Sequence, residues 1–226
     1  HPGYKASRDV PKSDPGMEQM MEEYVEQLPR LRELLVSMGV GQIRAERYEA
    51  DDIAGHLVSA APLNRFVLMT NDEDWLQLVS DRVWVWQPKK ARYVTPENFV
   101  EVTGVPTGEL FMEMKSIVGD KGDDVPGCDG IGEVTAAKFL AGELAPLKSG
   151  AKGKKQIAVE AYLGTPAHQL AKRLVDLRSM RIPLAAIRLT PGEFDQMEFY
   201  RAINHYGFES IVGHFNTWVE PFKRAA

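Results

Sequence analysis

The sequence has few cysteines, no long apolar run and no excess of positive charge. It contains one cysteine, Cys128, among 226 residues, which excludes an intrachain disulfide and a multi-cysteine zinc site and fits a reducing compartment. No apolar run reaches the roughly 18 residues that a membrane-spanning helix needs. The net charge is -5, without the basic excess of many nucleic-acid-binding proteins. What remains is a globular composition with 44% hydrophobic residues, enough for a substantial core.

The charge is distributed unevenly along the chain. Residues 146–226 carry 12 Lys and Arg against 7 Asp and Glu, whereas the acidic excess lies entirely in residues 1–145. Contacts that release counterions from a polynucleotide need only a local basic face. The negative net charge therefore does not exclude nucleic acid as a partner.

The hydrophobic pattern predicts an α/β fold with a parallel-type central sheet flanked by helices. Strands and helices alternate in the first half, an order in which ligands gather at the carboxyl ends of the strands. After residue 108 the pattern predicts helices alone, so we expect an α/β core at 1–105 and a helical part at 106–226. The expected strands are 42–47, 65–70, 82–86 and 92–94. The expected helices are 17–38, 49–58, 72–78, 109–118, 133–141, 167–180, 196–206 and 209–219, and we expect a kink or break at Pro29 in the first of them.

Three short acidic clusters occur where the edge of a sheet would expose them. Glu or Asp in a first helical turn is common as a dipole partner, and Asp is common in caps and turns, so each cluster alone has a structural explanation. Together in one cleft they would repel strongly unless divalent cations neutralised them. Oxygen ligands without His or Cys favour Mg²⁺ or Mn²⁺ over zinc. The candidate metal ligands are Glu49, Asp51, Asp52, Asp72, Asp74, Asp120 and Asp123.

A glycine-rich hairpin at 125–136 joins two of the expected helices. Glycines allow backbone N–H groups at the start of a helix to approach a phosphate closely, which would grip a nucleic-acid backbone without reading its sequence. The structural alternative is a tight turn between helices. The candidate DNA contacts in this hairpin are Gly127, Gly130, Ile131, Gly132 and Thr135.

These segments together resemble the structure-specific 5′ nucleases, which include flap endonucleases and the 5′ nuclease domain of bacterial DNA polymerases. The likeness is carried by the runs YEADD at 48–52, TNDED at 70–74 and GDKGDDVPG at 119–127, followed by GIG at 130–132 and TA at 135–136. It spans residues 4 to about 141, and the helical tail is most similar to stand-alone phage enzymes. The resemblance implies a helix-three-turn-helix region that binds duplex DNA, often with a K⁺ ion held by loop carbonyls.

The resemblance also implies roles for the acids and for the N-terminal residues. Acids like Glu49, Asp51 and Asp52 hold a first metal ion in that family, and acids like Asp72, Asp74, Asp120 and Asp123 hold a second. Two such ions can activate a water and stabilise the leaving oxygen of a phosphodiester. Lys5 and Arg8 match a basic stretch that contacts the scissile phosphate, and Tyr4 matches a residue that stacks on a base.

One part of the family pattern is absent from this sequence. Family members have, before the match at Tyr4 and Lys5, a segment with the first central strand, further metal-binding aspartates and part of a helical arch. We therefore expect an incomplete chain, and intact-mass measurement of the source material is the check.

The expected function is metal-dependent hydrolysis of branched or flapped DNA near junctions of single strand and duplex, in primer removal during replication or repair. We expect two Mg²⁺ or Mn²⁺ ions, no membrane association, a monomer, and a cytoplasmic location in a bacterial or phage-infected cell. Two alternatives stay open: a nuclease of the same fold that acts as a 5′-to-3′ exonuclease or favours RNA in RNA–DNA hybrids, and a non-catalytic protein that binds DNA junctions.

Overall fold

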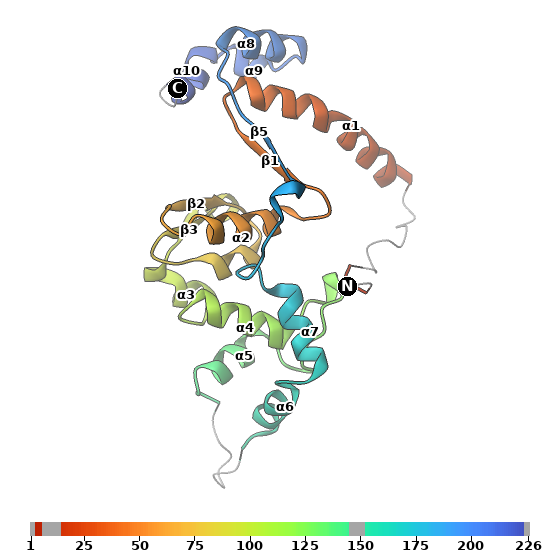
Figure 1. Cartoon of the computed structure of the whole chain (residues 1–226), viewed down its shortest axis with the longest axis vertical. Helices are drawn as coiled ribbons and strands as arrows, with labels where there is room; N and C mark the ends of the chain where they lie inside the picture. Colours follow the sequence, from red (N-terminus) through yellow and green to blue (C-terminus); the bar gives the residue numbers. More distant parts are fainter. Residues whose placement is uncertain (1–2, 6–14, 145–151, 224–226) are drawn as a thin grey trace. The chain divides into compact units, whose positions relative to one another are not determined.

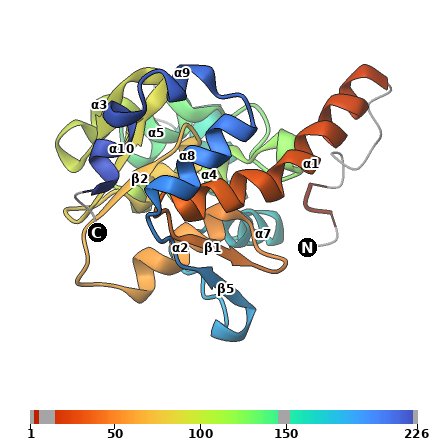
Figure 2. The same cartoon turned by 90° about the horizontal axis from the view of Figure 1, so that it is seen from above.

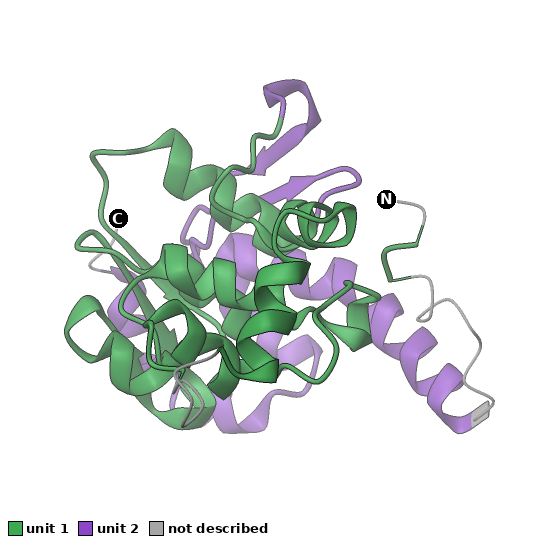
Figure 3. Cartoon of the chain, turned by 90° about the horizontal axis from the view of Figure 1, so that it is seen from below, with its two compact units in different colours: residues 1–11, 49–182 green, residues 12–48, 183–226 purple. Residues whose placement is uncertain are grey.

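The computed structural model describes residues 3–5, 15–144 and 152–223. The chain forms two compact units (Figure 3): unit 1 comprises residues 1–11 and 49–182, and unit 2 comprises residues 12–48 and 183–226. Within the described ranges, no helix is both long and apolar enough to cross a membrane. The two units are described separately below.

Unit 1 contains a three-stranded sheet in the order β2-β3-β4. Strand β2 (Phe66–Met69) lies beside β3 (Val83–Gln87) (Figure 1) and runs parallel to it. Strand β4 (Arg92–Val94) runs antiparallel to β3. The alternation of side chains gives the sheet one buried face, where Val83, Val85 and Val94 are completely covered. Burial of these β-branched side chains stabilises the sheet.

The opposite face of this sheet is exposed in unit 1. Trp84 and Tyr93 are 43% and 49% accessible, and the neighbouring Val67 and Met69 on β2 are more exposed still. Trp86 lies 4.7 Å from Tyr93 between ring centroids. The aromatic side chains of β3 and β4 therefore pack mainly against one another, which stabilises the strand pair.

Helices cover the buried face of the sheet and carry the loops that contain the acidic motifs. Phe111, Met114 and Ile117 of α4 enter the same core as Val85 and Val94. The helices are α2 (Ala50–Ala60), α3 (Phe99–Thr103), α4 (Gly108–Val118), α5 (Glu133–Leu140), α6 (Lys154–Tyr162) and α7 (Pro166–Val175), with short 3-10 helices η2 (Glu73–Leu78), η3 (Pro88–Lys90), η4 (Pro96–Asn98) and η5 (Lys121–Asp123).

Helices α4 and α7 are held together by a buried polar cluster. The His168 ring nitrogen Nε2 lies 3.2 Å from Ser116 Oγ and 3.3 Å from a Glu113 carboxylate oxygen, and Nδ1 accepts a hydrogen bond from the Gly164 N–H. Every polar atom of this ring therefore has a partner, as a buried histidine requires. The cluster fixes the helix from which the loop at 119–132 begins.

Unit 2 combines a two-stranded ribbon with a helical cluster. Strand β1 (Gln42–Ala45) pairs antiparallel with β5 (Ile187–Thr190). Helix α8 lies against α1 (Figures 1 and 2), where Leu34, Phe199, Ile203 and Val219 form a separate core. The helices are α1 (Pro15–Ser37), α8 (Gln196–His205), α9 (Glu209–Val212) and α10 (Phe215–Lys223), with a 3-10 helix η6 at Leu184–Ala186.

The α/β class and the parallel pairing of β2 with β3 are confirmed. Several details of the predicted fold are wrong. Strand β1 does not join the β2-β3-β4 sheet, a strand (β5) exists after residue 108, and a helix (α6) occupies residues 154–162. Helix α1 also continues through Pro29 without a break.

The two compact units have other bounds than the α/β core at 1–105 and the helical part at 106–226, which stay a prediction. Residues 106–182 pack with residues 49–105 because Phe111, Met114 and Ile117 complete the core under the sheet. Residues 12–48 instead join residues 183–226, because β1 finds its hydrogen-bonding partner in β5.

Candidate nuclease site

The first acidic cluster begins helix α2. Glu49 is the N-cap residue and forms a reciprocal capping box with Asp52, whose carboxylate accepts the Glu49 N–H at 2.9 Å. Burial, together with the negative charges of Asp52 and Glu49, raises the pKa of Asp51. The caps account for the fold of these residues. A positive charge placed beside Asp51 would stabilise its ionised form.

Lys5 connects this cluster with a distant loop of unit 1. Its ammonium contacts the Glu49 carboxylate and lies 3.8 Å from the Asp123 carboxylate, and its backbone N–H donates to the Asp123 carbonyl at 3.1 Å. Burial opposes its charge, but the hydrogen bonds to Glu49 and Tyr4 outweigh this and raise the pKa of Lys5. The ammonium also lies 4.9 Å from the Tyr4 ring centroid. Three segments far apart in the sequence thus meet at Lys5.

The second cluster directly follows β2, as the sequence predicts. Asp72 caps η2 by accepting the Asp74 N–H at 3.0 Å. Asp74 pairs with Lys115 of α4, at 2.9 Å between the carboxylate and ammonium. Burial alone would lower the pKa of Lys115, but the charges of Asp74, Asp120 and Glu133 hold it above the ordinary value. Lys115 is therefore a fixed positive charge beside these acids.

The third cluster lies in the loop between α4 and α5. Asp120 caps η5 by accepting the Gly122 N–H at 2.7 Å, and its backbone pairs with that of Val125. Asp123 ends the same turn and faces Lys5. The loop is therefore closed by its own hydrogen bonds, which sets the positions of both carboxylates before any ligand binds.

The seven candidate ligands are not gathered into a metal cage. Among the described residues, no group of three or more His, Cys, Asp and Glu side chains is close enough to hold a metal ion. Lys5 contacts acids of the first and third clusters, and Lys115 contacts an acid of the second. The donors are all carboxylate oxygens, which fits a hard divalent cation by chemistry, and the two ammonium groups supply positive charge at the same acids.

The sequence did not indicate Lys115 as a site residue. The available signal was its place on the last turn of the helix that leads to Asp120. A lysine there is also the ordinary partner of a helix C-terminus, so its proximity to Asp74 could be found only from the packing of α4 against η2. Arg8, the other predicted basic residue, lies outside the described residues.

The predicted DNA contacts of the hairpin fall into two groups. Gly130 and Gly132 face open space, with no heavy atom within 4 Å of an added Cβ, and Gly132 is the N-cap of α5. Thr135 is half-buried and accepts a hydrogen bond from Lys155. Gly127 and Ile131 have structural explanations, because the Ile131 side chain lies in the core and a Cβ at Gly127 would meet the Val118 carbonyl at 2.0 Å.

This difference predicts unequal stability effects for two glycine substitutions. We expect Gly127→Ala to lower the thermal unfolding temperature, because backbone must move to admit the methyl group. An effect of about 1–3 kcal/mol is the usual size for such overpacking. Gly132 is at an open position with ordinary backbone angles. The free energy of unfolding of Gly132→Ala should therefore lie within about 1 kcal/mol of that of the unsubstituted chain. Equal unfolding temperatures for both variants would contradict the assignment of Gly127 to packing.

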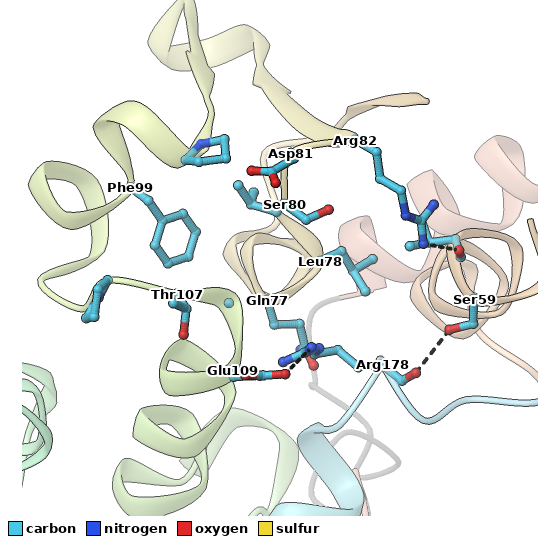
Figure 4. A pocket seen from close by; sticks show the side chains of 15 residues that line it. Ser59, Gln77, Leu78, Ser80, Asp81, Arg82, Phe99, Thr107, Glu109 and Arg178 are labelled. Atoms are coloured by element: carbon cyan, nitrogen blue, oxygen red, sulfur yellow. Dashed lines mark hydrogen bonds and ion pairs between the residues drawn. The ribbon is translucent and has the colours of Figure 1, made fainter. Parts of the chain in front are cut away.

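A cavity of about 530 Å³ lies in unit 1 away from these acids (Figure 4). It is lined in part by the turn that precedes β3, so it faces the end of the strands opposite to Asp72. Its cations are already paired: Arg82 donates to the carbonyls of Val58, Ala61 and Asn64, and Arg178 pairs with Glu109 at 2.6 Å. The polar side chains that line the cavity therefore hold neighbouring segments together and are not arranged as a hydrolytic site.

Comparison with known proteins gives consistent matches. Residues 1–104 match the family model of the 5′-3′ exonuclease N-terminal resolvase-like domain. DNA polymerase I of Bacillus subtilis is 37% identical over 131 residues, which are 55% of this chain and 15% of that protein. DNA polymerase I of Mycobacterium tuberculosis is 33% identical over 235 residues, covering 94% of this chain and 24% of that protein. The chain thus spans less than a quarter of the length of these relatives.

Solved structures of bacteriophage T5 proteins share the fold. The T5 5′-exonuclease with divalent zinc ions bound has a TM-score of 0.67 and 22% identity, covering 98% of this chain and 77% of that one. A T5 flap endonuclease in a pseudo-enzyme-product complex with DNA and metal ions has a TM-score of 0.62 and 21% identity, with the same coverage of both chains. Almost the whole chain therefore has a counterpart in one known fold.

Proposed function

We propose that this chain, a member of the 5′ nuclease family, is a divalent-metal-dependent 5′ nuclease that hydrolyses phosphodiester bonds of DNA near junctions of single strand and duplex. The observation that supports this most directly is the meeting of Lys5, Glu49 and Asp123 in unit 1. A cation and two carboxylates from three separate segments form a charged surface suited to a phosphodiester and its counterions.

The acids of the three clusters would hold the metal ions. Glu49, Asp51 and Asp52 supply oxygens for one ion, and Asp72, Asp74, Asp120 and Asp123 supply oxygens for another. Caps occupy one carboxylate oxygen of Asp52, Asp72 and Asp120, which orients the remaining oxygens. When bound, Mg²⁺ or Mn²⁺ would supply Lewis acidity toward the oxygens of the phosphodiester.

The basic and aromatic residues of the same site would orient the substrate. Lys5 stays protonated because its pKa is raised, so it can neutralise charge that develops on the scissile phosphate. Arg8 would add a second contact to that phosphate. Tyr4, held against Lys5, offers an aromatic face on which a base of the single strand can stack.

The glycine hairpin would bind the duplex part of the substrate. The open surroundings of Gly130 and Gly132 leave the backbone at the start of α5 accessible to a phosphate. The loop carbonyls near Gly127 are candidates for a K⁺ ion. The acidic Glu133 in the first turn of α5 would repel a phosphate there, so a cation in the loop would favour this contact.

A second candidate function is binding of DNA junctions without cleavage. It is favoured by the lysine contacts at the acids. It is also favoured because, in the described ranges, no three His, Cys, Asp or Glu side chains are close enough to hold a metal ion. In that case the ammonium groups would be the permanent partners of the carboxylates. The hairpin would then be the functional part of the protein.

Cleavage of a 5′-labelled flap substrate by the 226-residue chain separates the two candidates. With Mg²⁺ present we expect products cut near the junction, and EDTA should abolish them while a binding assay still detects the complex. A matched substrate with an RNA flap strand measures the preference for RNA–DNA hybrids. A matched substrate with a plain 5′ end measures exonuclease activity. Retention of binding without cleavage at any Mg²⁺ or Mn²⁺ concentration would favour the non-catalytic candidate.

A further inference from the structure

The β1–β5 ribbon of unit 2 (Gln42–Ala45 and Ile187–Thr190) places two arginines directly opposite each other. Arg44 and Arg188 are Cα partners in the antiparallel register, so their side chains leave the same face of the ribbon. Both are exposed. Like charges in directly opposed positions destabilise a strand pair, so the fold itself gives no reason for this arrangement.

A third arginine lies beside this pair in a strained conformation. Arg47, in the turn that follows β1, has φ of 67°, a left-handed backbone that a long side chain rarely adopts. Such strain is retained mainly where the surrounding structure or a ligand requires it. Together with Arg188, Tyr48 and Glu46, Arg47 lines a hollow of about 590 Å³ in unit 2.

The three guanidinium groups have no carboxylate partner in the part of the chain that the structure describes. Arg188 donates only to the carbonyls of Ala185 and Ile187, at 3.1 and 3.5 Å. By contrast, Arg178 and Arg201 each form an ion pair with a glutamate. Arg47 and Arg188 bring two positive charges to the hollow against the one carboxylate of Glu46, and Arg44 adds a third positive charge on the same face of the ribbon. On a chain whose net charge is -5, this local positive charge points to an anionic ligand.

We propose that the ribbon arginines Arg44, Arg47 and Arg188 form a contact site for the phosphodiester backbone of a polynucleotide. Guanidinium groups bind phosphate oxygens in a bidentate geometry, and two of them spaced across a strand pair can span neighbouring phosphates. The half-buried Tyr48 ring provides an apolar wall beside them. This inference rests on the proposed function because it takes DNA as the polynucleotide, but it concerns residues outside the acidic clusters.

The test is the salt dependence of DNA binding, measured by fluorescence anisotropy with a labelled mixed-sequence duplex in EDTA. The double variant Arg44→Gln with Arg188→Gln should bind more weakly, and the slope of log affinity against log NaCl should fall in magnitude by about 1.8, or about 0.9 per lost phosphate contact. The variant Arg201→Gln removes an exposed, paired charge of unit 2 and should keep the original slope. The double variant Arg44→Lys with Arg188→Lys, which keeps both charges, should also keep it.

Folding and catalysis are measured separately from DNA binding. Because the opposed charges destabilise the ribbon, the double Gln variant should unfold at or above the temperature of the unsubstituted chain, which excludes misfolding as the cause of weaker binding. Flap cleavage in Mg²⁺ reports the proposed nuclease independently of the slope. An unchanged slope in the double Gln variant overturns the ribbon site, as does a chain that binds no duplex. Binding of a poly-glutamate peptide that is lost in this variant, with an unchanged DNA slope, would assign the ribbon to an acidic protein partner instead.

Discussion

The variant Asp72→Asn is expected to lose flap cleavage by more than about 100-fold, since loss of even an outer partner of a metal ligand costs 10- to 100-fold. Asn retains the carbonyl oxygen that caps η2 through the Asp74 N–H, and it is as good a cap as Asp. The substitution therefore removes a negative charge from the candidate metal site while preserving the local fold. Single-turnover cleavage of the labelled flap in Mg²⁺ measures the effect.

A matched control is available in unit 2. Asp195 caps α8 by accepting the N–H groups of Met197 and Glu198 at 2.9 Å, so Asp195→Asn makes the same chemical change at the same kind of position. It should leave cleavage unchanged. Duplex binding in EDTA should be retained by both variants, because neither substitution removes a positive charge. Undiminished cleavage by Asp72→Asn would remove Asp72 from the metal site.

The local elements were predictable because their patterns are strong. The run of apolar residues at 83–86 alternates between a buried Val and a more exposed Trp, and the acids of Asp72 and Glu49 stand next to clear strand and helix boundaries. Lys5, Glu49 and Asp123 meet in the structure. Their roles toward metal and phosphate stay predictions, which the substitutions above and below test.

The partner of β1 was not predictable in the same way. Strand β5 is four residues long, and three of them are exposed, so it lacks the alternation or the apolar run that marks a strand. Its pairing with β1, about 140 residues away in the sequence, depends on backbone hydrogen bonds that carry no side-chain signal. The same reason hides the opposed arginines, because only the register brings Arg44 and Arg188 together.

The packing of Gly127 could not be predicted for a related reason. A glycine that admits a phosphate and a glycine that admits a neighbouring carbonyl look identical in a sequence. The Val118 carbonyl fills the space beside Gly127, whereas nothing lies near Gly132. Only the packing of the hairpin separates the two uses.

Lys5→Met is expected to slow cleavage by about 100- to 1,000-fold, the usual effect of removing one group that stabilises transition-state charge. Met keeps the length and apolar stem of the side chain, and the backbone bond from position 5 to the Asp123 carbonyl does not depend on the ammonium. The raised pKa of Lys5 means that its charge persists through the usual range of lysine titration. Lys5→Arg, which keeps the charge, should retain more activity than Lys5→Met.

Stability distinguishes a catalytic Lys5 from a structural one. Its partner Glu49 is 45% exposed, so solvent screens the pair, and its loss should change the free energy of unfolding by at most about 1 kcal/mol. Lys90→Met, which breaks the exposed pair of Lys90 with Glu73 in the same unit, serves as the control and should leave cleavage unchanged. If Lys5→Met instead lowered the unfolding temperature strongly and cleaved at the original rate once folded, Lys5 would be a tether for the Asp123 loop. A large loss of rate with little loss of stability can arise only if the ammonium acts on the substrate or on the charge balance of the acids around it.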